Sequence, residues 1–301
     1  MSTIEERKTP QNQDEFFQKK KIFKNLSAVD IVAKFFKWLT LIVYLLIALL
    51  PMIWLAISSF KTNIEFQLSP FSLPAQWQFS NYMNAINMTG LPSLFLHSII
   101  VAVMALVINL AVTTMASFVI SREEFFGRKV LYNLIVAGVL VPIISLMVPY
   151  FTLIHRVGLY DTLWALGFTY ASVNIPISIF LLTSFMRAIP KELEEAAIID
   201  GASFIQRYTK IVFPLSKVGI VTAGTFIFIF AWNEFIFALL LTSSEAARTL
   251  QLGIRFFTSQ FISDYTSMYA ALVITIIPSI FIYIFFHEKI IRGLTSGAVK
   301  G

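Results

Sequence analysis

Few residues in this sequence have the types and spacing that an enzyme active site needs. Cysteine is absent, and the three histidines lie far apart without metal-ligand spacing. Glu194 and Glu195 are adjacent, so on a helix their side chains point about 100° apart and do not converge as a catalytic pair would. The glycine-containing segment 219–225 lacks the lysine of a phosphate-binding loop. We therefore expect a protein that is not an enzyme and that binds no metal or cofactor of its own.

The composition predicts a chain that lies mostly in a lipid bilayer. Hydrophobic residues make up 57% of the 301 residues and charged residues 13%, against roughly 45–50% and 25% in soluble domains. The mean hydropathy is +0.77. A soluble core could not bury so much apolar surface, whereas lipid solvates it. The net charge of +6 comes from basic residues just outside apolar runs, which is typical of orientation signals and not of nucleic-acid binding.

Six apolar segments are long enough to cross the membrane, because about 20 helical residues span about 30 Å of hydrocarbon. They contain no charged residue except Glu234 in the fifth, and they cover 38–60, 94–120, 130–154, 162–186, 218–244 and 265–287. Six spans put both termini on the same side. Lysine and arginine are concentrated in the two tails and in the second and fourth connecting loops. This excess predicts that both termini of a multi-pass membrane protein are cytoplasmic.

The expected organisation is an all-α integral membrane protein with three parts. These are a cytoplasmic N-terminal tail (1–35), a six-helix transmembrane domain (36–292) and a cytoplasmic C-terminal tail (293–301). From Phe16 onward the N-terminal tail mixes apolar residues and lysines near helical spacing. This pattern fits either an amphipathic helix on the lipid surface or an extension of the first span. Prolines should kink the third span at Pro142 and Pro149 and the fourth at Pro176.

The longest cytoplasmic loop carries the signals of a helical hairpin over residues 188–214. Pro190 can open a helix whose first turns hold three glutamates, where the helix dipole favours negative charge. Gly201 can end that helix in a left-handed conformation. A second short helix then leads to Pro214, which begins the fifth span.

Two stripes of this hairpin are candidates for docking another protein. One face of the first helix carries, at helical spacing, Leu193, Ala196, Ala197 and Asp200. The two alanines would let another surface approach closely. A stripe of the second helix carries Phe204, Tyr208 and Ile211. The alternative is a solvated, charge-bearing loop without a partner.

The spacing within the hairpin resembles that of a known family. Glu195-Ala196-Ala197, then Gly201, Ile211 and Phe213-Pro214, resemble the EAA loop of ABC-importer permeases, which usually has Leu-Pro at the last pair. The resemblance implies that the hairpin docks into a groove on a cytoplasmic ATPase. The residues it assigns to docking are Leu193, Glu195, Ala196, Ala197, Asp200, Gly201, Phe204, Tyr208, Ile211 and Pro214.

Two further segments resemble the carbohydrate importers within that family, particularly the group of the smaller permease subunit of the maltose transporter. They are the run from Ser59-Phe60-Lys61-Thr62 to Phe79-Ser80-Asn81-Tyr82, and the C-terminal residues 293–301. The resemblance implies a multi-pass protein of the prokaryotic inner or plasma membrane and a sugar substrate. It also implies a second permease subunit that is a different chain, two ATPase subunits that bind ATP and magnesium, and an extracytoplasmic solute-binding protein. No nucleic acid is expected as a partner, and membrane lipid surrounds the spans.

The candidate substrate pathway within the bilayer consists of Asn174, Trp232, Asn233 and Glu234. Glu234 is the only ionisable residue deep in a span, so it should face the helix bundle or water. Amides and an aromatic face suit a sugar, but the same side chains could instead join helices through hydrogen bonds. An ion-coupled secondary transporter is the alternative function, although it would need more ionisable residues at membrane depth.

The segment between the first two spans, 66–94, has no charged residue and should lie outside the cell. It could contact the binding protein or sit on the membrane surface. The last outer loop, 253–264, should contain a short interfacial helix around Arg255.

Overall fold

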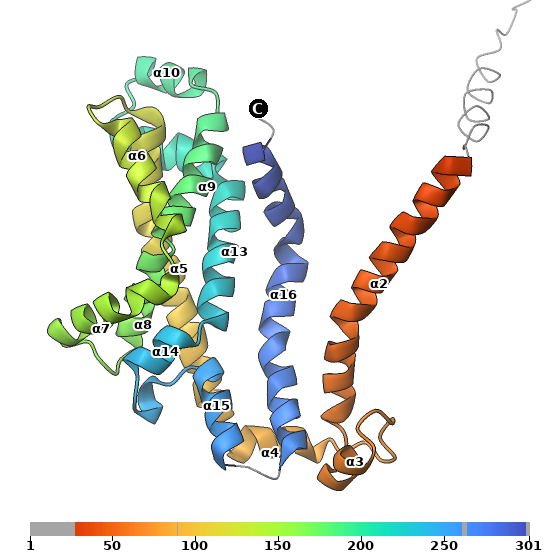
Figure 1. The fold of residues 1–301 in the computed structure, drawn as a ribbon. Helices are drawn as coiled ribbons and strands as arrows, with labels where there is room; N and C mark the ends of the chain where they lie inside the picture. Colours follow the sequence, from red (N-terminus) through yellow and green to blue (C-terminus); the bar gives the residue numbers. More distant parts are fainter. Residues whose placement is uncertain (1–27, 89, 261–263, 299–301) are drawn as a thin grey trace, which may run out of the picture. The chain divides into compact units, whose positions relative to one another are not determined.

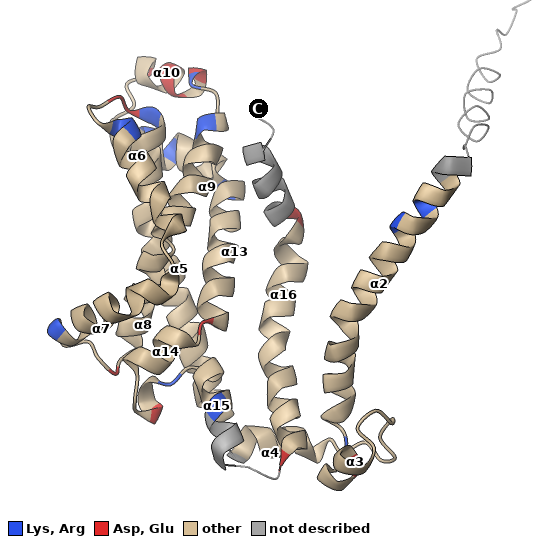
Figure 2. Ribbon diagram, in the orientation of Figure 1, with Lys and Arg blue, Asp and Glu red and all other residues tan. Residues whose placement is uncertain are grey.

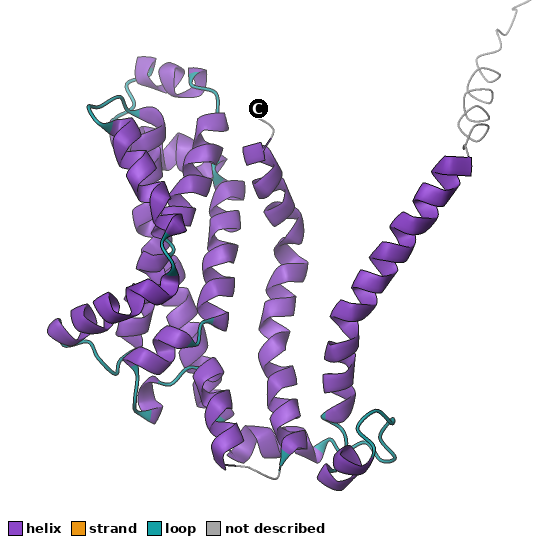
Figure 3. Ribbon diagram, in the orientation of Figure 1, coloured by secondary structure: helices purple, strands orange, loops and turns teal. Residues whose placement is uncertain are grey.

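The computed structural model describes residues 28–88, 90–260 and 264–298, and this part of the chain is helical without any strand (Figure 3). In chain order the helices are α2 (Ala28–Ser58), α3 (Asn63–Leu68), α4 (Ser80–Met88), α5 (Leu91–Arg122), α6 (Arg128–Ala137), η1 (Gly138–Leu140), η2 (Ile143–Leu146), α7 (Met147–Arg156), α8 (Leu163–Val173), α9 (Ile175–Ala188), α10 (Glu192–Ile199), α11 (Phe204–Gln206), η3 (Arg207–Val212), α12 (Phe213–Leu215), α13 (Lys217–Asn233), α14 (Ile236–Leu241), η4 (Glu245–Ala247), α15 (Leu250–Gln260) and α16 (Tyr265–Ala298). The prediction of an all-α membrane protein is confirmed.

Three helices are individually long and apolar enough to cross a membrane, and three bent pairs bring the number to six if each pair forms one span. The single helices are Ile31–Ser58, Leu91–Arg122 and Tyr265–Glu288. The bent pairs are Arg128–Leu140 with Ile143–Arg156, Leu163–Val173 with Ile175–Ala188, and Phe204–Leu215 with Lys217–Asn233. The six predicted segments coincide with these elements, except that the fifth begins earlier and is interrupted at Glu234.

Proline explains two of the bends. The third span turns by 103° at Val141–Pro142, where Pro142 lacks the backbone donor that a continuing helix requires. The fourth turns by 48° at Asn174, with Pro176 in the first turn of α9. Pro149 lies in the first turn of α7, a position that tolerates proline. The predicted kinks at Pro142 and Pro176 are thus confirmed.

The chain divides into two units, residues 1–55 and 56–301. In the first unit, α2 begins at Ala28 and carries apolar side chains that are exposed on all sides. Helix α2 includes residues 28–35 of the predicted N-terminal tail, while the first part of the predicted amphipathic pattern, residues 16–27, lies outside the described residues. Such a helix needs lipid or protein around it.

The second unit is built around α5, which packs against α8, α9 and α13 (Figure 1). One buried cluster joins α5 to α7, α8, α13 and α14, with Leu166, Tyr170, Ile227 and Phe237 at its centre. A smaller cluster of Phe118, Met186 and Val212 joins the last turns of α5 and α9 to η3. The helices that enter the hairpin are therefore held together directly below it.

Charged side chains of the second unit gather at its two ends and are scarce between them (Figure 2). Basic residues are frequent at the end that carries α10, where α16 also finishes (Figures 1 and 2). The basic residues of the other connections are few: Lys61 precedes α3, Arg156 ends α7, Arg248 follows η4 and Arg255 lies in α15. An excess of basic residues is typical of the cytoplasmic face, and on this ground the cytoplasmic location of the α10 end stays a prediction from the sequence.

Candidate coupling hairpin and translocation path

The first helix of the hairpin, α10, ends in a Schellman turn. Gly201 has φ +81°. Its N–H donates to the carbonyl of Ile198 at 3.0 Å, and the Ala202 N–H donates to the carbonyl of Ala197 at 2.8 Å. These two bonds satisfy carbonyls that the helix end would leave unpaired. The predicted left-handed glycine is confirmed.

The second helix begins with a capping box. The Ser203 hydroxyl accepts from the Gln206 N–H, and the Gln206 side chain accepts from the Ser203 N–H at 2.8 Å. A π-helical turn, η3, follows and continues through Pro214 into α13 after a bend of 74°. The hairpin is therefore an ordered extension of the fourth and fifth spans.

The stripe on the second helix packs against α5 through Phe204 and Tyr208. The rings of Phe204 and Tyr208 lie 5.1 and 5.3 Å from the ring of Phe118 in α5. The Tyr208 hydroxyl also lies 2.8 Å from that of Thr114. Both predicted docking residues thus contact α5, although Phe204 remains partly exposed.

The hairpin exposes large apolar side chains beside charged ones. Leu193 and Ile198 are about half exposed, Ile199 is 86% exposed and Ile205 is 68% exposed. The predicted residues Glu195, Ala196 and Asp200 are exposed as well. Several large apolar side chains exposed at one tip are typical of an interaction site. Sequence reasoning missed the three isoleucines, which the i, i+3, i+4 pattern of the first helix does not include.

A groove of about 340 Å³ separates the two halves of the hairpin. Its lining residues are Ala197, Asp200, Gly201, Ala202, Gln206, Lys210 and Ile211. The groove thus brings together Ala197, Asp200, Gly201 and Ile211, four of the predicted docking residues.

The inner side of α10 is held by buried charges. Glu194 carries an ion pair to Arg122 of α5 at 2.8 Å, and the two side chains are only 6% and 3% exposed. Arg207 lies 3.6 Å from Glu194 and 2.7 Å from Glu123. Removing one partner of a buried pair costs about 3–5 kcal/mol, because the other charge stays desolvated. Sequence reasoning placed Glu194 among the glutamates of the first helical turns and counted Arg122 and Arg207 as orientation signals, but it paired none of these residues. The partners lie far apart in the chain, so spacing could not pair them.

Glu234 lies where the fifth span is interrupted. One carboxylate oxygen accepts from the Tyr170 hydroxyl at 2.6 Å. The two oxygens also accept from the N–H groups of Phe237 and Ala238 at the start of α14. Asn174 donates to the Tyr170 carbonyl at 2.8 Å. Tyr170 therefore links two of the predicted pathway residues, and Glu234 joins α8 to α14 through hydrogen bonds.

The other two predicted pathway residues point elsewhere. Trp232 is buried between Phe95 and Phe228, and its indole N–H donates to the carbonyl of Thr275 in α16 at 3.1 Å. Asn233 is exposed and donates to the carbonyl of Ile229 in its own helix. The four residues therefore do not converge on a single site.

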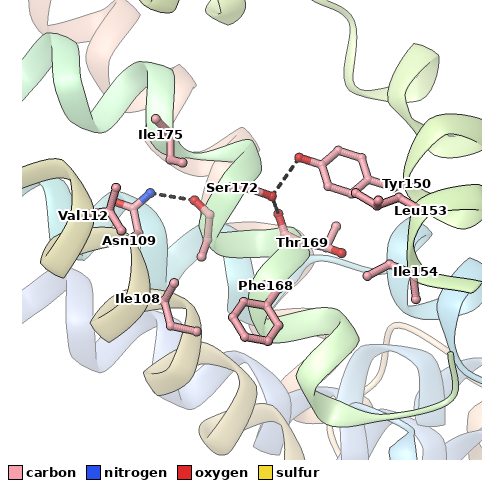
Figure 4. Close-up of a pocket in the computed structure, with 11 residues that line it drawn as sticks. Ile108, Asn109, Val112, Tyr150, Leu153, Ile154, Phe168, Thr169, Ser172 and Ile175 are labelled. Atoms are coloured by element: carbon pink, nitrogen blue, oxygen red, sulfur yellow. Dashed lines mark hydrogen bonds between the residues drawn. The ribbon is translucent and has the colours of Figure 1, made fainter. Parts of the chain in front are cut away.

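A separate cavity of about 260 Å³ lies between α5, α7 and α8 (Figure 4). Its walls are mainly apolar and include Phe168. Asn109 donates to the carbonyl of Ala171 at 2.7 Å, and the hydroxyls of Tyr150 and Ser172 lie 2.8 Å apart. The Thr169 hydroxyl is buried and has no hydrogen-bond partner within the described residues. Apolar walls with a few polar groups are typical of small-molecule pockets.

The segment after the first span, which the sequence predicts to lie outside the cell, is shaped by Lys61. Its ammonium group is fully buried and donates to the carbonyls of Ser69 and Pro70 at 2.8 and 3.0 Å and to the Ser72 hydroxyl at 3.4 Å. The Asn81 amide donates to the carbonyls of Ser59 and Lys61, both at 2.8 Å. Bonds between the motifs 59–62 and 79–82 thus close the residues between them into an ordered loop.

Two carboxylates fix the remaining loops at this end. Burial raises the pKa of Asp161, but the N–H groups of Ser243 and Ser244, at 2.7 and 2.9 Å, outweigh it and hold that pKa below its ordinary value. For Asp264, hydrogen bonds from Asn63 and Ser267 likewise outweigh burial and lower the pKa.

The predicted short helix of the last outer loop is present as α15.

Comparison with known proteins adds independent information. Residues 113–296 match the family model described as the inner membrane component of binding-protein-dependent transport systems. A diacetylchitobiose uptake system permease of Streptomyces coelicolor is 33% identical over 86% of this chain and 87% of its own length. A trehalose/maltose transport system permease of Thermococcus litoralis is 35% identical over 85% and 93%.

A solved bacterial ABC transporter that imports alginate contains a chain with the same fold. Its TM-score is 0.78 at 23% identity, and the match covers 88% of this chain and 98% of that one.

Proposed function

Because the chain belongs to the family of inner membrane components of binding-protein-dependent transport systems, we propose that it is the permease subunit of an ATP-driven carbohydrate importer. In this proposal it forms half of the translocation path and is coupled to a separate ATPase through the hairpin 188–214. Permeases of this family transport and do not catalyse, so ATP and magnesium bind to the partner ATPases. The sugar assignment rests on the relatives from Streptomyces and Thermococcus, which are named for oligosaccharide uptake.

The observation that carries the coupling role is that one hairpin combines exposed apolar side chains at its tip with buried ion pairs on its inner side. Leu193, Ile198 and Ile199 are exposed, whereas Glu194 on the same helix is buried in ion pairs. A loop that served only as a connection would need neither feature. The groove that Ala197 and Gly201 help to line offers a further surface for a partner's side chain.

The transport cycle follows from this arrangement. ATP binding closes two ATPase subunits against each other and moves the docked hairpins of this chain and of a second, different permease. The pair then opens outward, where an extracytoplasmic binding protein releases its sugar, and ATP hydrolysis resets it. We assign to the binding protein the surface of the ordered loop that Lys61 holds, where Phe71 and Leu73 are exposed.

The hydrogen bonds of Glu234 argue against the alternative, an ion-coupled secondary transporter. Proton coupling requires a carboxylate that can take up and release a proton during transport. Here Tyr170 and two backbone N–H groups already occupy the carboxylate oxygens. That role fits a helix connection better than a proton relay.

The test is purification in mild detergent after co-expression with the neighbouring transporter genes, followed by uptake in vesicles. Trehalose, maltose and diacetylchitobiose serve as radiolabelled probes. We expect an ATPase to co-purify and at least one probe to accumulate only with internal ATP. Uptake driven by a proton gradient without ATP would contradict the proposal.

A further inference from the structure

We infer that Arg122, Glu194, Arg207 and Glu123 form the connection through which movement of α10 reaches α5 and α9. This inference rests on the proposed function, because it assumes that α10 receives the motion of an ATPase. We call the four side chains the ionic link. They are positioning residues and do not themselves contact the ATPase.

Arg122 joins three elements at one point. Its Nε pairs with Glu194 of α10 at 2.8 Å. One of its terminal nitrogens donates to the carbonyls of Met186 at 2.6 Å and Ile189 at 3.0 Å. Those carbonyls belong to the C-terminal end of α9, whose negative dipole end favours a guanidinium. Since Arg122 is itself the last residue of α5, α5, α9 and α10 meet at this side chain.

Arg207 makes a second connection from the other half of the hairpin. It pairs with Glu123, just beyond the end of α5, at 2.7 Å and lies 3.6 Å from Glu194. Its guanidinium also lies 5.5 and 6.0 Å from the ring centres of Phe204 and Phe118. Both helices of the hairpin are therefore tied to the same end of α5.

Burial makes the link stiff. Arg122 and Glu194 are almost inaccessible to solvent, so separating them would leave two charges without water or a counter-charge. The nearby pair of Arg128 and Glu124 differs, because Glu124 is 78% exposed and water can replace its partner. A displacement of α10 should therefore carry α5 and α9 with it, whereas the Arg128 pair can open freely.

The experiment uses the full complex of this chain with its co-expressed partner subunits. The chain has no cysteine, so Val112→Cys on α5 provides a single labelling site in the wall of the cavity between α5 and α8. A membrane-permeant maleimide reports the labelling rate with and without ATP and vanadate. Retained ATPase and membrane abundance are measured on the same samples.

Three variants separate positioning from simple stability. Glu194→Gln keeps the shape but removes the charge. Arg122→Lys keeps the charge but lacks the planar fork that reaches Glu194 and the carbonyls together. The double variant Arg122→Met with Glu194→Met removes both charges, and such apolar replacement of a buried pair often preserves stability. Glu124→Gln, which breaks the exposed pair and leaves the hydrogen bond from Arg128 to the carbonyl of Glu123 in place, is the matched control.

We expect the control to behave as the parent and the double variant to reach the membrane at normal abundance with ATPase bound. In the double variant the effect of ATP on the labelling rate should fall about tenfold, a typical scale for loss of coupling between sites. Arg122→Lys and Glu194→Gln should show the same loss in the complexes that assemble.

An unchanged ATP effect in assembled complexes of the double variant would overturn the inference, even if Glu194→Gln fails to assemble. Absence of bound ATPase from the unsubstituted chain would overturn the proposed function and the inference together. The two failures are thus seen in different samples.

Discussion

Replacing Gly201 with valine tests whether the turn after α10 sets the geometry of docking. Gly201 has φ +81°, and a Cβ built there would meet no heavy atom within 4 Å. The penalty is therefore one of backbone conformation and not of a clash, and it amounts to about 1–2 kcal/mol for a residue with a Cβ. That free energy reduces the population of the native turn about 5- to 30-fold relative to alternative turns.

In alternative turns the N–H groups of Gly201 and Ala202 no longer reach the carbonyls of Ile198 and Ala197. The second helix would then leave α10 at a different angle. We expect Gly201→Val to lower both ATPase co-purification and ATP-driven uptake of the transported probe sugar, by up to about 30-fold, the upper end of that change in ratio, with normal abundance in the membrane. Gly201→Asn should lie between the parent and valine, since asparagine tolerates the left-handed region.

The matched control is Gly127→Val. Gly127 also has φ +81° with no heavy atom within 4 Å of a built Cβ, but it precedes α6 and lies outside the hairpin. The same backbone penalty there should leave ATPase binding intact. Normal uptake by Gly201→Val, or an equal loss in both variants, would refute the assignment of the turn to docking.

Four further predictions concern other parts of the molecule. Ala197→Glu places a charge in the groove of the hairpin, so co-purified ATPase should fall about tenfold or more at unchanged abundance, as expected for an unpaired charge in an interface; normal ATPase retention would argue against docking there. Glu234→Gln keeps a side chain that can still accept from backbone N–H groups, so most uptake should persist, and loss of uptake in a normally assembled complex would instead show that its charge is needed. A cysteine at position 203 should be labelled only from the cytoplasm and one at position 72 only from outside. Labelling of position 203 in intact cells by an impermeant reagent would contradict the predicted topology. The hydrogen bonds that Asp161 accepts lower its pKa, so this carboxylate stabilises the fold above the unfolded-state pKa of 3.8 and loses that contribution as pH falls through its folded pKa. The melting temperature of Asp161→Asn should therefore be below that of the parent at neutral pH and approach it in acid. A difference in melting temperature that does not depend on pH would contradict this prediction.

Local signals in the sequence predict the spans, two of the kinks and the turn at Gly201. Each depends on residues close together in the chain, such as proline after an extended residue or glycine after a helix. Pro142 and Gly201 adopt their conformations for reasons of their own backbone, so tertiary context changes them little.

The pairing of distant residues has no such local signal. In the sequence Glu194 is one of three glutamates in the first turn of a helix, and only the fold brings Arg122 and Arg207 to it. Tryptophan suits a sugar, which is why Trp232 is a predicted pathway residue, yet its N–H donates to the carbonyl of Thr275 in a helix distant in sequence. The break at Glu234 also lacks a local signal, since glutamate is not among the usual N-cap residues; only the fold shows that its carboxylate accepts from the N–H groups of Phe237 and Ala238.

The way in which Lys61 holds its loop has an evolutionary consequence. Two of its three acceptors are main-chain carbonyls, those of Ser69 and Pro70, which every amino acid possesses. These two bonds therefore hold the loop backbone whatever side chains stand at the acceptor positions. The exposed Leu73 can be exchanged for other residues while the lysine keeps the backbone in place. A subunit built in this way can change which external protein it recognises through a few point mutations, without rebuilding the scaffold that presents them.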